Sequence, residues 1–172
     1  MRIQPPSRRA FTLVELLVVI SIIAMLVGLL FPAVQAALRK AEASKAKSTI
    51  LSIATAFKAY DREYSGWPSG VSTSPRNVTT NLFTNPRGIV FLDVAIKDID
   101  SSGNILDPWK NPYRVAFDPS GSSSIPNPFT LPAGTPATIS ADVIVWSIGP
   151  DGQSSDNGGT AGNIDSDNIV SW

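Results

Sequence analysis

The hydrophobic pattern divides the chain into three parts. An apolar run extends from Phe11 to Phe31 and contains one charged residue, Glu15. In residues 32–64 apolar side chains recur at every third or fourth position, whereas residues 65–172 combine short apolar stretches with many Pro, Gly, Ser and Asn residues. The pattern therefore predicts a membrane-spanning helix, its amphipathic continuation and a globular head.

The apolar run is long enough to cross a bilayer, because about 21 helical residues match the roughly 30 Å hydrocarbon core. Arg2, Arg8 and Arg9 precede the run and no basic residue lies within it. This asymmetry predicts that the N-terminus is cytoplasmic and that the head lies across the membrane. A carboxylate at this depth costs on the order of a few kcal/mol, so we expect Glu15 to have a function.

Three interpretations of this N-terminus compete. A secretory signal peptide has a shorter apolar region, of about 7–15 residues, followed by a small-x-small cleavage site. A plain signal anchor fits the length of the run but leaves its acidic residue unexplained. The third interpretation explains both the arginines and the acid, because the sequence resembles the class III signal of type IV pilins and type II secretion pseudopilins. The residues that carry this resemblance are Arg9-Ala10-Phe11-Thr12-Leu13-Val14-Glu15.

The resemblance implies that a prepilin peptidase removes residues 1–10 by cutting between Ala10 and Phe11 and then methylates the Phe11 amine. Ala10 stands where Gly is usual in the family. Glu15 would neutralise the new amine of a neighbouring subunit during assembly, since a paired charge costs far less than a single one in an apolar medium. Pro32 occupies the place of a proline common in the family. Physically, it either kinks the helix or ends the membrane span.

Beyond Pro32 the sequence remains typical of a helix. The apolar positions there have spacings of three and four, which place them on one helical face. They are Ile50, Ile53, Phe57, Tyr60 and Tyr64. We predict one helix from Phe11 to about Glu63, membrane-spanning over residues 11–31 and amphipathic over residues 32–64, which stops before the turn-forming Gly66-Trp67-Pro68.

The head, residues 65–172, is predicted to contain a small antiparallel sheet. Strands are expected at Tyr113–Phe117 and Val143–Ser147, which are rich in Val, Ile and aromatic residues. Gly88–Ile96 is expected to form either a short strand or one or two helical turns, and residues 66–86 and 119–141 are expected to be loops. A sheet packed on the amphipathic half of the helix gives the α+β class.

A turn motif precedes the first predicted strand. Residues 107–113 read Asp-Pro-Trp-Lys-Asn-Pro-Tyr. Two prolines and an asparagine favour a rigid turn, and Trp109 offers it a large apolar anchor. The motif resembles the turn that enters the first strand in the major (G-type) pseudopilin of type II secretion, with Lys110 in place of the usual Gly.

The C-terminal segment is acidic, with four Asp and no basic residue in residues 151–172. Oxygen ligands on a Gly-rich loop suit Ca²⁺, although Asp-Gly sequences are also common in ordinary turns. The segment resembles the calcium-binding loop of the major pseudopilin. The resemblance implies side-chain ligands at Asp151 and at Asp165, Asp167 or both, with backbone ligands from Ile148 and Gln153. Asp156 is a further candidate, because the loop here is longer than usual.

Composition excludes several kinds of chemistry. The chain has 172 residues with neither Cys nor His, which rules out disulfides, thiol catalysis, Ser-His-Asp triads and zinc sites built on these residues. We therefore expect no enzymatic activity. After removal of the first ten residues, 11 basic residues face 14 acidic ones, so no nucleic-acid-binding surface is expected.

Taken with the resemblance, these features predict a structural subunit of a type II secretion pseudopilus. It would be anchored in the inner membrane and assembled into a periplasmic filament for protein export. Expected partners are further copies of the chain, the prepilin peptidase, an inner-membrane assembly platform and minor pseudopilins. The alternatives are a type IV pilin for adhesion, motility or DNA uptake, and an enzyme or binding domain on a signal anchor. The acidic loop and the lack of a C-terminal cysteine pair disfavour a typical major pilin.

Overall fold

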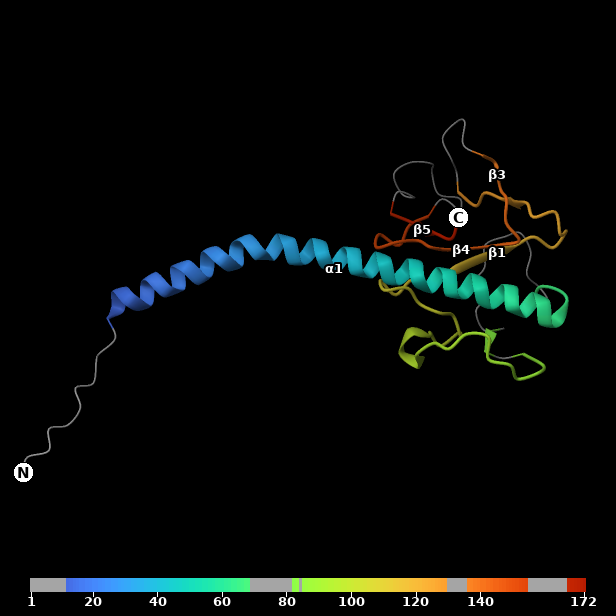
Figure 1. Cartoon of the computed structure of the whole chain (residues 1–172), viewed down its shortest axis with the longest axis horizontal. Helices are drawn as coiled ribbons and strands as arrows, with labels where there is room; N and C mark the ends of the chain where they lie inside the picture. Colours follow the sequence, from blue (N-terminus) through green and yellow to red (C-terminus); the bar gives the residue numbers. More distant parts are fainter. Residues whose placement is uncertain (1–11, 69–81, 84, 130–135, 155–166) are drawn as a thin grey trace, which may run out of the picture. The chain divides into compact units, whose positions relative to one another are not determined.

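The computed structural model describes residues 12–68, 82–83, 85–129, 136–154 and 167–172. Among these residues, a long helix is followed by the 3₁₀ turn η2 and by short strands (Figure 1). The elements are α1 (Leu13–Tyr64), η2 (Ile96–Asp98), β1 (Arg114–Phe117), β2 (Ile125–Pro126), β3 (Thr138–Ile139), β4 (Val143–Ser147) and β5 (Ile169–Val170). One long helix with small antiparallel sheets confirms the predicted α+β class.

Helix α1 begins at Leu13 and ends at Tyr64, close to the predicted limits. It continues through Pro32, which has no N–H to donate to the carbonyl of Gly28 four residues earlier. Ser65 ends the helix with a φ of +53°, the left-handed conformation that commonly follows the last helical residue. The chain divides into two compact units, Met1–Ala41 and Glu42–Trp172, so the second half of α1 belongs to the head unit.

Within the head unit, the predicted apolar stripe of α1 is buried. Ile50, Ile53 and Phe57 are fully buried, and Tyr60 is nearly so. Ile50, Ile53 and Phe57 share one core cluster with Tyr113 and with inward-facing residues of β1 and β4. The Phe57 ring meets the edge of Phe117 with 4.8 Å between ring centroids. The periodicity of α1 thus corresponds to its packing against the sheet.

The main sheet has the order β1-β4-β5, with both strand pairs antiparallel. Val115 pairs with Val145, and these residues face α1. Ala116 pairs with Ile144, and these face a second cluster on the other side of the sheet. Because both faces are covered, β4 is buried along its whole length, and its first four residues are all apolar rather than alternating with polar ones. The predicted strands Tyr113–Phe117 and Val143–Ser147 are confirmed to within one residue.

Two expectations for the head were wrong. Residues 88–95 form neither a strand nor helical turns, and η2 begins only at Ile96. Val90 and Ile96 are 68% and 89% exposed. Phe91, Leu92 and Val94 are partly buried against the core, so the apolar composition of this segment reflects irregular chain packed on the head rather than a strand or a helix. The expected loop 119–141 contains β2 and β3, which pair with each other. Ile125 and Ile139 from these strands are buried in the second cluster.

Candidate functional site

The first candidate site lies at the N-terminus of α1, where Glu15 closes a capping box with Thr12. The backbone N and the Oγ1 of Thr12 each donate to Oε2 of Glu15 at 2.9 Å. The backbone N of Glu15 donates to Thr12 Oγ1 at 3.2 Å. This reciprocal pattern satisfies N–H groups that a helix start otherwise leaves unpaired. The Thr-x-x-Glu spacing that marks such a cap is present in the sequence at Thr12 and Glu15.

The capping box leaves part of the Glu15 carboxylate available. Both Thr12 bonds end on Oε2, and Oε1 accepts no hydrogen bond from any residue that the structure describes. Ala10 and Phe11, the predicted cleavage and methylation residues, lie outside the described residues. The arrangement holds the carboxylate at the helix start, where the helix dipole favours a negative charge.

The N-terminal half of α1 carries its apolar side chains on the outside. From Leu13 to Phe31 the large apolar side chains are 47–86% exposed. Of the helices among the described residues, α1 is the one long and apolar enough to cross a membrane. A shallow groove on this segment surrounds Gly28 and Pro32, and its other lining residues are Ile20, Ile23, Ala24, Val27 and Phe31. So much apolar surface requires a membrane or other protein chains to cover it.

The second candidate site is the acidic C-terminal loop. Asp167 Oδ2 accepts a hydrogen bond from the backbone N of Asp151 at 3.3 Å, so two predicted ligands 16 positions apart lie side by side. Asp151 Oδ1 accepts from the backbone N of Gln153 at 2.8 Å. Ile148 is buried at the start of the loop. The other two predicted ligands, Asp156 and Asp165, lie outside the described residues.

A buried oxygen of Asp167 lacks a hydrogen-bond donor among the residues that the structure describes. Asp167 Oδ1 is buried and accepts no hydrogen bond from the described residues. A buried carboxylate oxygen without a donor is costly, and a cation can satisfy it. Two carboxylates with nearby carbonyls form an all-oxygen donor set, which suits Ca²⁺ better than a transition metal. The described residues contain no cluster of three or more acidic groups placed to hold a metal.

The turn motif, residues 107–113, lies directly against this loop. Asp107 is buried, and its Oδ1 accepts from the backbone N of Trp109 at 2.9 Å and of Asn111 at 2.8 Å. Its Oδ2 accepts from Ser147 Oγ at 2.6 Å. Burial raises the pKa of Asp107, while hydrogen bonds from Ser147, Asn111 and Trp109 oppose the shift. The sequence indicated the turn and the loop separately but not this link, which joins residues 40 positions apart.

Lys110, the departure from the usual Gly, has a φ of +75°. This is the left-handed region, which glycine adopts freely and other residues adopt at a cost. The turn therefore accommodates a side chain only with backbone strain. The Lys110 Nζ lies 4.0 Å from Asp98 Oδ1, a distance at which an exposed ion pair contributes little.

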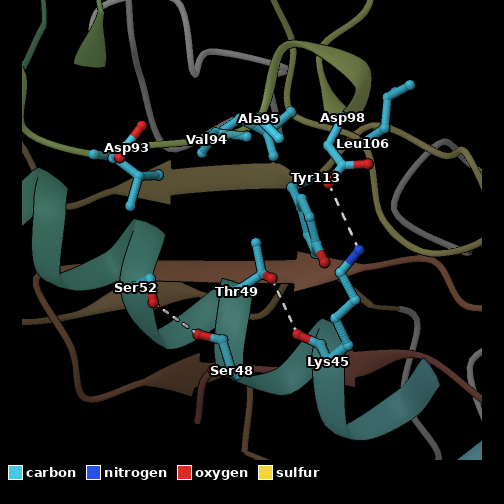
Figure 2. Close-up of a pocket in the computed structure, with 12 residues that line it drawn as sticks. Lys45, Ser48, Thr49, Ser52, Asp93, Val94, Ala95, Asp98, Leu106 and Tyr113 are labelled. Carbon is cyan, nitrogen blue, oxygen red and sulfur yellow. Dashed lines mark hydrogen bonds and ion pairs between the residues drawn. The ribbon is translucent and has the colours of Figure 1, made fainter. Parts of the chain in front are cut away.

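A polar cavity of about 220 Å³ lies between the second half of α1 and residues 92–98 (Figure 2). Lys45 Nζ lies 3.6 Å from Asp98 Oδ2 at its edge. Thr49 Oγ1 donates to the backbone carbonyl of Lys45 at 3.0 Å, so this hydroxyl is engaged by its own helix. Burial raises the pKa of Tyr113, which stays a neutral phenol at physiological pH. These contacts join the second half of α1 to the rest of the head unit. No pattern in the sequence indicates this cavity.

Comparison with known proteins gives one match. Residues 5–31 match the family model described as the prokaryotic N-terminal methylation motif. Searches of curated proteins and of solved structures gave no match. The chain therefore carries a prepilin-type N-terminal signal, as predicted. Such a signal indicates a type IV pilin-like subunit that prepilin peptidase processes and that assembles into a filament, a kind of protein that is typically not an enzyme.

Proposed function

We propose that the chain is a structural subunit of a type II secretion pseudopilus, which assembles from the inner membrane into a periplasmic filament for protein export. The observation that carries this proposal is the methylation motif at the start of a helix whose apolar side chains are exposed. The preference for a pseudopilin over a pilin rests on the head. There the turn at residues 107–113 is hydrogen bonded to the loop that contains Asp151 and Asp167.

Assembly would depend on the charge of Glu15. Cleavage after Ala10 creates a positive amine at Phe11, and methylation leaves that amine positive. Oε1 of Glu15 in a neighbouring copy would accept this amine, while Thr12 keeps the carboxylate oriented through Oε2. The pair removes two isolated charges from an apolar environment, so docking in register is favoured over other positions. The leader, residues 1–10, would prevent assembly until the peptidase has acted.

The test of processing is the mass of the N-terminal peptide. The chain is purified from cells with and without an active prepilin peptidase. We expect N-methylated Phe11 as the first residue in the first case and Met1 or the full leader in the second. A leader that stays intact in the presence of the peptidase would contradict processing and favour a plain signal anchor.

Calcium is proposed as a structural ligand of the head. Asp151 and Asp167 would hold it, together with Asp156 or Asp165 and backbone carbonyls of Ile148 and Gln153. The ion would tie the C-terminal loop to the sheet in a chain that has no cysteine for a disulfide. Extracellular sites of this kind have a Kd of about 10⁻⁴–10⁻³ M, so stabilisation appears at millimolar Ca²⁺.

A type IV pilin remains the alternative, because the matched segment, residues 5–31, does not include the head. Deletion of the chain separates the two functions. Loss of exoprotein from the medium with normal motility and adhesion supports the pseudopilin. Normal secretion with lost motility, adhesion or DNA uptake would support the pilin instead.

A further inference from the structure

The side chain of Asn111 reaches from the turn into the C-terminal loop. Its Nδ2 donates to the backbone carbonyl of Gly149 at 2.9 Å. Its Oδ1 lies 3.5 Å from the place that a Cβ on Gly152 would occupy. Asn111 is therefore hydrogen bonded to the loop at Gly149 and lies near Gly152, on either side of Asp151, one of the proposed calcium ligands.

The N–H of Gly149 is also held by the head. It donates to Ser147 Oγ at 3.1 Å, and that hydroxyl in turn donates to the buried Asp107. The turn at residues 107–113 thus fixes both polar backbone groups of Gly149, the carbonyl directly through Asn111 and the N–H through Ser147. Two such bonds determine the orientation of the Gly149 backbone.

The orientation of Gly149 determines where Asp167 lies. Gly149 has a φ of +71°, and a Cβ on it would lie 2.6 Å from both the backbone O and the Oδ2 of Asp167. No side chain fits in this space. Asp167 packs on the bare backbone of Gly149, and its Oδ2 accepts from the N–H of Asp151 at 3.3 Å. A change in the Gly149 backbone would therefore separate the two carboxylates.

We infer that Asn111 is a positioning residue for a divalent cation at Asp151 and Asp167. The inference rests on the proposed calcium site and adds a residue that holds the loop in its binding arrangement without touching the ion. Partners of this kind orient metal ligands, and their loss typically weakens metal affinity by about 10–100-fold. The sequence offers no signal for this role, because Asn111 and Gly149 are 38 positions apart.

The test measures Ca²⁺ binding by calorimetry on the full chain in detergent micelles. We expect Asn111→Ala to raise the Kd for Ca²⁺ by about tenfold or more, because the Gly149 carbonyl loses its donor. Lys110→Ala is the matched control in the same turn, since its exposed side chain has no hydrogen bond to the loop, and its Kd should stay within about twofold of that of the unchanged chain.

A pair of glycine substitutions tests whether the Gly149 backbone positions Asp167, without any change at Asn111. Gly149→Ala forces a Cβ onto Asp167, whereas Gly121→Ala places one in open space at nearly the same φ, +70° against +71°. Both variants carry similar backbone strain, so only the first should weaken Ca²⁺ binding. Circular dichroism of each variant without Ca²⁺ verifies that the fold is retained; if Asn111→Ala does not fold, the glycine pair decides.

The outcomes separate the inference from the proposal on which it rests. An unchanged chain that binds no Ca²⁺ at millimolar concentration would overturn both. A chain that binds Ca²⁺ with the same Kd after Asn111→Ala, or after Gly149→Ala, would leave the calcium site standing and overturn the positioning role. A lower melting temperature with an unchanged Kd would likewise show a purely structural role for Asn111.

Discussion

The N-terminal half of α1 and the head unit differ in where they place their apolar side chains. Residues 12–41 expose their apolar side chains and place one carboxylate, Glu15, at the helix start. The head, Glu42–Trp172, has a core of two buried apolar clusters on either side of the main sheet. The first region is built for contacts outside the chain and the second for contacts within it. The segment that matches a family model, residues 5–31, covers part of the first region and none of the head.

This difference has a physical reason. A helix that must cross a membrane, pass through a peptidase and pack against other copies is constrained at fixed spacings along the sequence. A small α+β head requires only apolar side chains of suitable volume and a few satisfied polar groups, and many sequences meet those conditions. The N-terminus therefore indicates the class of protein, whereas the distinction between pseudopilin and pilin depends on the head.

The largest expected effect concerns Glu15. Glu15→Val should abolish filament assembly while membrane insertion and the melting temperature of the head stay unchanged, because the neighbour's amine loses its partner. Filaments are counted by electron microscopy, and insertion is measured by membrane fractionation. Thr12→Ala removes only the cap and should reduce assembly partially, with Thr12→Ser as its control. Normal filaments from Glu15→Val would contradict the assignment of the N-terminal half of α1 to contacts between copies through Glu15.

The second prediction concerns a substitution that destabilises the head and leaves the N-terminal half of α1 unchanged. Phe57→Ala should lower the free energy of unfolding by about 3–5 kcal/mol, because a fully buried ring that packs on Phe117 is lost. Denaturant unfolding followed by tryptophan fluorescence measures this change, and membrane insertion should persist. Leu51→Ala is the control, since Leu51 lies on the same helix with 47% of its surface exposed. A similar loss in both variants would contradict the assigned core.

The third prediction concerns the calcium loop. Ca²⁺ at about 100 times its Kd should stabilise the head by about 2.7 kcal/mol, and chelation should reverse the effect. Asp151→Ala should remove this stabilisation, whereas Asp142→Ala, an acidic change outside the loop, should preserve it. The measurement is the melting temperature with and without Ca²⁺. Equal melting temperatures for the unchanged chain in both conditions would exclude a structural calcium site.

The smallest expected effect is a gain in the free energy of unfolding of the head. Lys110→Gly should stabilise the head by about 0.5–1 kcal/mol, because glycine adopts the left-handed conformation without strain. The greater flexibility of glycine in the unfolded chain offsets part of the gain. Denaturant unfolding resolves this change, and Lys97→Gly, at an exposed position without a positive φ, should not stabilise. A loss of stability in Lys110→Gly would contradict the strain assigned to this turn.

The sequence predicted those features of the fold that depend on periodicity. The spacing from Ile50 to Tyr60 corresponds to the buried face of α1, and the segment Val143–Ser147, rich in Val, Ile and aromatic residues, is β4. It did not predict β2 and β3, since two-residue strands are too short to produce a pattern. It also failed for residues 88–96, where an apolar composition coincides with exposed Val90 and Ile96.

For the candidate sites too, the sequence indicated local features but not contacts between distant positions. The sequence marked Glu15 and four acidic candidates, Asp151, Asp156, Asp165 and Asp167. The structure places Asp151 beside Asp167, and the other two lie outside the described residues. The capping box at Thr12 follows a known local spacing and was available from the sequence. The links from Asp107 to Ser147 and from Asn111 to Gly149 join positions 40 and 38 apart, and no local pattern reports such contacts.

The pairing of Glu15 with a neighbour's amine can be measured directly in assembled filaments. Copies labelled with ¹⁵N and unlabelled copies are mixed, assembled and treated with an apolar carbodiimide, which joins an amine to a nearby carboxylate. Mass spectrometry should then show peptides in which Phe11 of one isotope is bonded to Glu15 of the other. Cross-links found only within copies of one isotope, or none at Glu15 in intact filaments, would contradict the intersubunit pair.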